Sequence, residues 1–172
     1  MSFLEIAEKR YSVRSFDKTE VEDYKVDLIL KAAQLAPTAC NRQPQKILVV
    51  RTEEGLKKWY QCTPCHFAET LVFIICYEKE KDWKRSYDGE NSGTVDASII
   101  TTHMMLEASD IGVGSTWVMN FDPEKLGKLF DLPENYIPVS VLAMGCPAAD
   151  AEPAADHFKN KEITAFTYYE HF

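Results

Sequence analysis

The chain of 172 residues lacks a long hydrophobic run and lacks any excess of positive charge. Its most apolar stretch, residues 71–76, is far shorter than the roughly 20 residues that a membrane-spanning helix needs. Lysine and arginine total 19 against 27 aspartate and glutamate residues, so the formal net charge is −8. This balance argues against nucleic acid and anionic membranes as partners. A bound anion therefore requires a local basic site.

Cysteine is sparse too, with 5 residues scattered along the chain. The chain does not open with a basic segment followed by an apolar stretch, which is the pattern of a secretory signal peptide. We therefore expect reduced thiols in a cytoplasmic protein. Cys62 and Cys65 have the spacing of a redox pair, but they follow a predicted short helix, and no second such pair exists to complete a zinc site. A thiol–disulfide protein built on this pair is the less favoured alternative, and we predict no metal site.

The apolar residues that are present suffice for a core. Hydrophobic residues make up 45% of the chain and aromatic residues 12%, and a domain typically has about 50–250 residues. We therefore predict a single domain over residues 1–172. No internal repeat or flexible linker interrupts it.

Cap and stop signals outline the secondary structure. A capping box at Ser2-Phe3-Leu4-Glu5 predicts a first helix, with Phe3 and Ile6 facing inward. The segment 19–22 predicts the start of a second helix, which Pro37 ends. Further helices are expected over 53–60 and 94–111 and after Asp122-Pro123, and strands over 46–51, 71–77, 114–121 and 138–144.

Two segments indicate a second subunit. The predicted helix at 94–111, which Gly112 ends, is apolar on most faces, and a small monomer has few places to bury such a helix on several sides. The C-terminal tail, about 158–172, is rich in aromatic side chains and lacks a helical period. Such a tail would be an aggregation hazard if it were exposed. We therefore expect a homodimer in which the tail packs on the partner subunit.

The basic site that an anion needs has a candidate in Arg10-Tyr11-Ser12-Val13-Arg14. Two guanidinium groups offer planar, bidentate donors to a phosphate, and the serine hydroxyl adds a short neutral donor. The alternative interpretation is a solvated basic turn after the first helix.

Two further motifs lie at element boundaries. Residues 36–44 place two prolines around a polar loop, in which Asn41 and Gln43 offer donors and acceptors suited to the edge of a pyrimidine-like ring; an ordinary helix-to-strand turn is equally compatible. Residues 112–117 read Gly-Val-Gly-Ser-Thr-Trp. These glycines follow a helix instead of a strand, so they are not a dinucleotide-binding fingerprint.

Taken together and in this order, the motifs resemble the nitroreductase family of flavoproteins, and the match spans nearly the whole chain. The resemblance rests on Arg10-x-Ser12-x-Arg14-x-Phe16, Ala36-Pro37-Thr38-x-x-Asn41-x-Gln43-Pro44, Ile111-Gly112-x-Gly114-Ser115-x-Trp117 and Val141-x-x-Met144-Gly145-x-Pro147. It implies an α+β fold with a mostly antiparallel central sheet flanked by helices, in an intertwined homodimer that holds FMN at its interface.

The resemblance also implies the roles of individual residues. Arg10, Ser12 and Arg14 would bind the FMN phosphate and ribityl chain, with Tyr11 contributing locally. Pro37, Thr38 and Asn41 would reach the flavin from the other subunit, and Gln43 would support this loop or the ring edge. Trp117, Val118 and Met119 would pass beside the isoalloxazine ring. The family commonly places a basic residue near the C-terminus on the phosphate; no arginine occurs there in this chain, and Lys159 is the candidate.

The activity that the resemblance implies is hydride transfer from NADH or NADPH, through the flavin, to a nitroaromatic, a quinone or a similar small acceptor. The cofactor carries this chemistry, so we assign no catalytic acid or base to the chain. NADH and NADPH both stay open as donors. The alternative from another functional class is an FMN-binding or sensing protein with little turnover.

Overall fold

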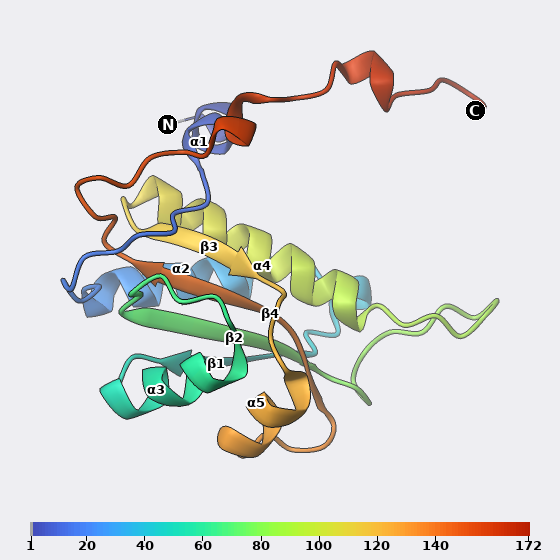
Figure 1. Cartoon of the computed structure of the whole chain (residues 1–172). Coiled ribbons are helices and arrows are strands. Elements are labelled where there is room, and N and C mark those ends of the chain that lie inside the picture. Colours follow the sequence, from blue (N-terminus) through green and yellow to red (C-terminus); the bar gives the residue numbers. More distant parts are fainter. Residues whose placement is uncertain (1) are drawn as a thin grey trace.

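The computed structural model describes residues 2–172 and contains one four-stranded sheet with helices on both faces (Figure 1). The strand order is β1-β2-β4-β3, and each neighbouring pair is antiparallel. The predicted α+β class with an antiparallel central sheet is therefore confirmed. The strands are β1 Gln45–Val50, β2 Leu71–Glu78, β3 Gly114–Val118 and β4 Tyr136–Gly145.

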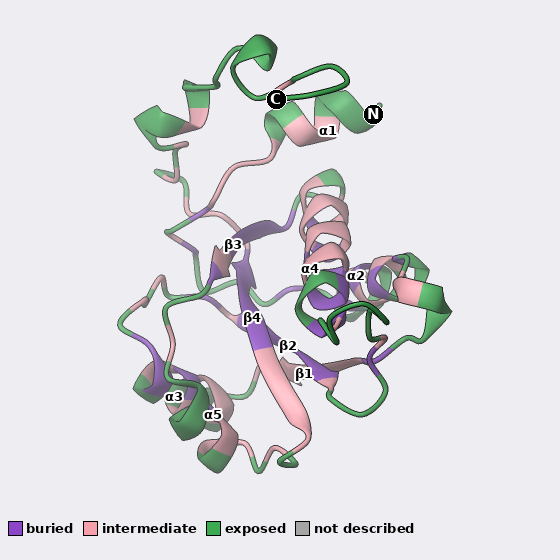
Figure 2. Cartoon of the chain, turned by 90° about the vertical axis from the view of Figure 1, so that its right-hand side faces the viewer, coloured by how far each residue is buried: buried purple, intermediate pink, exposed green. Residues whose placement is uncertain are grey.

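Two pairs of helices sandwich the sheet. Helices α2 and α4 pack on one face and α3 and α5 on the other, whereas α1 lies over α4 (Figures 1 and 2). The α-helices are α1 Phe3–Lys9, α2 Asp23–Leu35, α3 Glu53–Cys62, α4 Gly93–Asp110 and α5 Pro123–Leu129, and three 3-10 turns lie at η1 Ala39–Asn41, η2 Ala155–Phe158 and η3 Ile163–Ala165.

Strand β2 is the centre of the core. Its side chains alternate between the two faces, with Phe73 and Ile75 against α2 and α4, and Val72 and Ile74 on the side of α3 and α5. All four are fully buried, and each such side chain stabilises the fold by roughly 1.5–3 kcal/mol. Burial on both faces explains why the strand is continuously apolar, as the sequence predicted.

Helix α4 presents two kinds of surface. Ala97, Ile100, Met104 and Ala108 recur every three or four residues and are fully buried against the sheet. Other apolar side chains stay partly accessible, and Val95 is 60% exposed. The predicted stop is confirmed, because Gly112 adopts a positive φ of 76° just beyond the helix.

The capping box of α1 forms as predicted, with the Ser2 hydroxyl accepting from the Glu5 amide and the Glu5 carboxylate accepting from the Ser2 amide. The prediction that Phe3 faces inward is wrong for this chain, because the side chain is 66% exposed. The capping signal identifies where a helix starts, and does not determine which face is buried.

Several element ends differ from prediction. Helix α2 starts at Asp23, not at 19, because Val21 is buried in an extended segment that precedes it. Strand β3 stops at Val118 because the next residues pack on the end of α3, where the Thr63 hydroxyl donates to the Asn120 carbonyl at 2.6 Å. Helix α3 runs two residues beyond the predicted end, to Cys62.

The C-terminal tail leaves the body and makes few contacts with it. Its large side chains are mostly exposed, including Phe166 at 63%, Tyr169 at 82% and Phe172 at 102% (Figure 2). Among residues 2–172, no helix combines the length and the apolar character required to cross a membrane.

Candidate functional site

The segment carrying Arg10, Ser12 and Arg14 runs alongside the start of β3. Ser12 forms a parallel bridge with Ser115, and the Val13 amide donates to the Ser115 carbonyl at 3.0 Å. Val13 is buried at 3% exposure, whereas Arg14 is exposed. Because side chains alternate along an extended backbone, burying Val13 directs Ser12 and Arg14 away from the core.

Two glycines allow this close approach. A Cβ atom on Gly114 would lie 3.0 Å from Cγ2 of Val13 and 2.9 Å from Cγ of Pro147. A Cβ atom on Gly145 would lie 3.1 Å from Cδ1 of Phe16. The glycines of the predicted motifs therefore serve to seat the 10–16 segment on the sheet.

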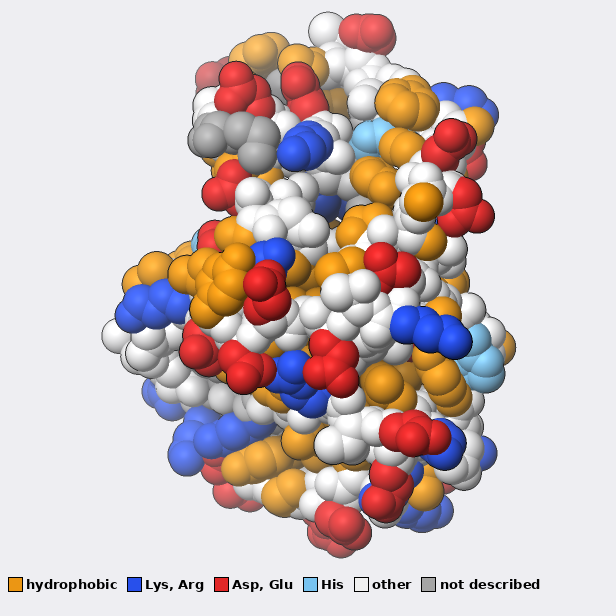
Figure 3. All heavy atoms as spheres, turned by 90° about the vertical axis from the view of Figure 1, so that its left-hand side faces the viewer, with side chains coloured by type: hydrophobic (Ala, Val, Ile, Leu, Met, Phe, Trp, Pro, Cys, Tyr) orange, Lys and Arg blue, Asp and Glu red, His pale blue; other side chains and the backbone are white. Residues whose placement is uncertain are grey.

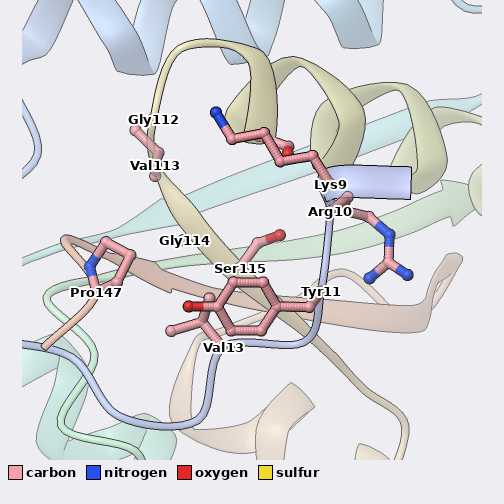
Figure 4. A pocket seen from close by; sticks show the side chains of 10 residues that line it. Lys9, Arg10, Tyr11, Val13, Gly112, Val113, Gly114, Ser115 and Pro147 are labelled. Atoms are coloured by element: carbon pink, nitrogen blue, oxygen red, sulfur yellow. The ribbon is translucent and has the colours of Figure 1, made fainter. Parts of the chain in front are cut away.

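A cavity of about 130 Å³ lies between this segment and the junction of α4 and β3 (Figure 4). Its lining includes Arg10, Tyr11, Ser115 and Pro147. The Tyr11 hydroxyl donates to the Ala151 carbonyl at 3.1 Å, which fixes the ring at the cavity wall. Sites for drug-sized ligands span roughly 300–1,000 Å³, so this cavity alone is too small for a whole flavin. Of the three predicted phosphate donors only Arg10 lines it, and Ser12 and Arg14 do not.

The charge of this region suits an anion. Arg51 and Arg85 form ion pairs, whereas Arg10, Arg14 and Arg42 have no acidic partner within residues 2–172. Of these three, Arg10 and Arg14 flank Ser12. The single hydrogen bond of the Arg14 side chain, to the Ser12 carbonyl, is long at 3.4 Å. Figure 3 shows acidic and basic side chains intermixed over one face of the molecule without a broad basic field. The guanidinium groups of Arg10 and Arg14 are therefore a local donor set, and their chemistry fits the phosphate of FMN.

The loop predicted to contact the flavin, residues 36–44, is held in a strained conformation. Cys40, Asn41 and Gln43 have positive φ values of 50°, 52° and 49°, which are uncommon for residues other than glycine. Within the loop, the Gln43 amide donates to the Thr38 hydroxyl at 3.0 Å, and the Gln43 side chain donates to Asn41 Oδ1 at 3.1 Å. Backbone strain of this kind concentrates at functional sites.

Asp96, which sequence reasoning missed, anchors this loop. Its side chain lies in the first turn of α4 and is 2% exposed. Oδ1 accepts from the Ala39 amide at 2.8 Å, and Oδ2 accepts from the Ser92 hydroxyl at 2.7 Å. An acidic residue at the start of an otherwise apolar helix was the available signal in the sequence.

The three residues at the end of β3 have different environments. Trp117 is half-buried and packs toward α2 and α4, and its Nε1 is buried without a hydrogen-bond partner within the described chain. Val118 packs in the core on the opposite face at 4% exposure, so only its backbone is accessible to a ligand. Met119 is 62% exposed. An unpaired indole donor beside the site fits a ligand with acceptor atoms.

The predicted residues fall into two groups at opposite ends of α4. Ser109 lines the cavity beside Arg10, whereas Asp96 holds the 36–44 loop at the other end. The thirteen intervening helical steps span about 20 Å. A single chain therefore does not bring the two groups together.

Lys159 lies on the side of the molecule that carries Tyr11. The Tyr11 and His157 rings are in edge contact, with centroids 6.3 Å apart. The ammonium group of Lys159 pairs with Asp156 at 2.7 Å and is exposed. Its predicted phosphate contact would have to compete with this carboxylate, and it stays a prediction.

The cysteine pair shows no feature of a redox site. Cys62 and Cys65 are free thiols. Cys62 is 3% exposed, and burial raises the pKa of its thiol, which disfavours the reactive thiolate. The described part of the chain also contains no cluster of His, Cys, Asp or Glu side chains arranged to bind a metal.

The fold and the motifs define a class of protein. The model of the nitroreductase family matches residues 7–70 and 58–146, so the chain belongs to the nitroreductase family. Among individual relatives, a protein of Archaeoglobus fulgidus named "Putative NADH dehydrogenase/NAD(P)H nitroreductase" is 32% identical over 165 residues, which cover 90% of this chain and 91% of that protein.

Solved structures give the same result. A nitroreductase family protein from Clostridium difficile 630 has a TM-score of 0.94 and 36% identity, with 100% of both chains covered. A structure named "FMN-dependent Nitroreductase" from Clostridium difficile R20291 has a TM-score of 0.80 and 24% identity, and covers 98% of this chain and 99% of that one. The first of these neighbours confirms the predicted nitroreductase-like fold, and the second shares it.

Proposed function

We propose that this protein is an FMN-dependent NAD(P)H oxidoreductase of the nitroreductase type. The observation that carries the proposal is the donor set of Arg10, Ser12 and Arg14, which has no acidic partner in the described chain and lies on the start of β3. The name of the Archaeoglobus fulgidus relative, which is 32% identical, supports NADH or NADPH as the electron donor.

FMN is favoured over FAD because the chain offers one phosphate site and no dinucleotide fingerprint for an adenylate half. When bound, FMN would supply hydride-transfer chemistry between NAD(P)H and a nitroaromatic, a quinone or a similar small acceptor. The chain binds and orients the cofactor. Arg10 and Arg14 hold the phosphate, Ser12 and Tyr11 support the ribityl end, and Trp117 to Met119 pass beside the ring.

The remaining contacts come from a second copy in this proposal. Pro37, Thr38, Asn41 and Gln43 lie about 20 Å along α4 from the phosphate donors, so they complete the site of the neighbouring chain. This arrangement makes the active unit a homodimer with FMN at the interface.

Three unpaired surfaces support the homodimer. An apolar groove of about 470 Å³ lies between α1, α2 and α4, where Phe3 and Leu35 are 66% and 68% exposed. The outer edge of β1 has no pairing strand among residues 2–172. The tail at 158–172 carries exposed aromatic side chains. We propose that residues 1–172 form one domain whose tail packs on the partner subunit, in a cytoplasmic protein.

The test is the cofactor of the purified protein, followed by its turnover. Mass spectrometry of the released cofactor should identify FMN, and the protein should consume NADH or NADPH steadily when a quinone is added. FAD or no flavin would refute the cofactor proposal. FMN without turnover would favour the alternative of a binding or sensing protein.

A further inference from the structure

Helix α4 places a carboxylate, that of Asp96, in the interior of the protein. The side chain is 2% exposed and lies in the first turn, beside Ala97 and Ile100, which are fully buried against the sheet. Asp96 Oδ2 accepts from the Ser92 hydroxyl at 2.7 Å, and this hydroxyl accepts from the Trp83 amide at 3.2 Å. The positive end of the helix dipole also favours a carboxylate in this turn. Asp96 is therefore an acceptor that the core holds in place.

The other oxygen of Asp96 caps a turn that its own N-cap residue leaves uncapped. Oδ1 accepts from the amide of Ala39 at 2.8 Å, and Ala39 is the first residue of η1. Thr38 stands at the N-cap position but makes no capping bond with its side chain. Its hydroxyl accepts instead from the Gln43 amide at 3.0 Å. The cap of this turn therefore comes from α4, 57 residues further along the chain.

The turn depends on such a cap because its backbone is strained. Cys40, Asn41 and Gln43 all have positive φ values, between 49° and 52°. Conformations of this kind persist only where the surrounding structure holds them. Without the bond from Asp96, the 36–44 loop would relax into other conformations, and only a fraction of the chains would keep it in the conformation that binds the flavin. The apparent affinity for the flavin falls by this fraction.

We propose that Asp96 is a positioning residue for FMN and that it acts on the flavin of the neighbouring chain, not on the flavin of its own chain. This inference rests on the proposed function, in which the 36–44 loop completes the neighbouring site. Asp96 lies at the end of α4 that holds this loop, whereas Ser109 lines the cavity beside Arg10 about 20 Å away. The carboxylate holds the loop, and the loop contacts the neighbouring flavin.

The first measurement is the Kd of FMN, titrated into the apoprotein. We expect Asp96→Ala to raise this Kd about 10- to 150-fold, which corresponds to the roughly 1.5–3 kcal/mol that a hydrogen bond to a charged group contributes. Asp96→Asn keeps an acceptor oxygen for the Ala39 amide but loses the charge, so its Kd should lie between those of the wild type and Asp96→Ala.

A matched control separates this role from a general loss of stability. Thr101 is fully buried on the same helix, and its hydroxyl bonds the Ser140 hydroxyl at 2.8 Å, away from the loop. Thr101→Ala should therefore lower the free energy of unfolding and leave the Kd of FMN unchanged. A purely structural role of Asp96 predicts instead that both substitutions raise the Kd in proportion to the stability they remove.

The second measurement identifies the chain on which Asp96 acts. It uses a mixed dimer of one chain with Asp96→Ala and one chain with both Arg10→Ala and Arg14→Ala. If Asp96 acts on the neighbouring flavin, one site of the mixed dimer combines all the substitutions and the other contains none. The mixed dimer should then bind one FMN with the wild-type Kd, although neither variant homodimer does. Two weak sites would overturn the inference.

A wild-type Kd in the Asp96→Ala homodimer would overturn it as well. If that chain does not fold by itself, Ser92→Ala, which removes only the partner of Asp96 Oδ2, replaces it in both measurements. A smaller rise in the Kd is then expected, and a wild-type Kd again contradicts the inference. A wild-type protein that binds no FMN would refute the proposed function itself, so the two failures are distinguishable.

Discussion

Replacing Glu69 by alanine should destabilise the fold strongly, because this carboxylate is buried and accepts three hydrogen bonds. Glu69 is 2% exposed. It accepts from Trp59 Nε1 at 2.7 Å, from the Phe67 amide at 3.0 Å and from the Tyr60 hydroxyl at 3.3 Å. The Phe67 carbonyl in turn accepts from the Phe16 amide at 3.2 Å. The network therefore connects α3 to the segment that carries the phosphate donors.

The size of the expected destabilisation follows from the hydrogen-bond donors that lose their acceptor. Trp59 is fully buried, and an unsatisfied buried donor costs about 1–3 kcal/mol, so the loss at Trp59 and Phe67 together is about 2–6 kcal/mol. For a domain of about 150–250 residues, 1 kcal/mol shifts the Tm by roughly 2–4 °C. The Tm of Glu69→Ala should therefore fall by about 4–24 °C.

The assay is urea denaturation followed by tryptophan fluorescence, with Glu53→Ala as the matched control. The Glu53 side chain is 84% exposed and pairs with Lys57 on the same helix. Glu53→Ala should therefore lower the free energy of unfolding by no more than about 0.5 kcal/mol. If Glu69→Ala lowered the free energy of unfolding by less than about 1 kcal/mol, the network would not hold α3 and the 63–70 segment together as we argue.

Two further predictions concern the site and the thiols. Arg10→Ala and Arg14→Ala should each remove a charge-assisted contact of about 1.5–3 kcal/mol and weaken FMN binding on the order of tenfold or more. Flavin titration measures this loss, and two variants that bind FMN like wild type would place the phosphate elsewhere. A thiol reagent at neutral pH should leave Cys62 unmodified, because burial raises the pKa of its thiol. Cys62→Ser should retain turnover, and a loss of turnover would revive the thiol alternative.

Local sequence signals predicted the element ends that a proline, a glycine or a capping side chain determines. Pro37 cannot continue a helix, and Gly112 adopts a positive φ at low cost, so the C-terminal ends of the two longest helices could be predicted. The Asp122 side chain accepts from the Lys125 amide, as the Asp-Pro pair indicated. Strand β2 was predicted from its continuous apolar run, and burial on both faces explains that run.

Features that depend on contacts between segments distant in the sequence could not be predicted from the sequence. Nothing in the local sequence relates Asp96 to Ala39, which lies 57 residues earlier. Val118 was assigned to the flavin with its neighbours, but alternation along β3 turns its side chain into the opposite core. The exposure of Phe3 has the same origin, because the packing of α1 is set by surfaces distant in sequence. The family motifs predict the segments of the site, and the sheet decides which atoms each segment presents.

The separation of the two groups of site residues along α4 makes a thermodynamic prediction. If each flavin contacts Arg10 from one chain and the 36–44 loop from another, FMN binds the dimer more tightly than the monomer. By reciprocity, FMN must then strengthen dimerisation by the same factor. Dilution of the apoprotein should therefore yield monomers at concentrations where the FMN-loaded protein remains dimeric, as measured by light scattering.

The tail provides a second perturbation of the same equilibrium. An obligate interface typically buries more than about 2,000 Å², and we assign residues 163–172 to it because Phe166 and Phe172 are exposed in the single chain. Deleting these ten residues should weaken the dimer and, through the coupling, lower FMN affinity, although the deletion removes no residue that we assign to the flavin. A flavin site formed by one chain alone predicts the opposite, namely a truncated monomer that keeps its FMN. A flavin-loaded monomer would therefore refute the shared site, whereas loss of dimer and flavin together follows only if the two chains complete each other's site.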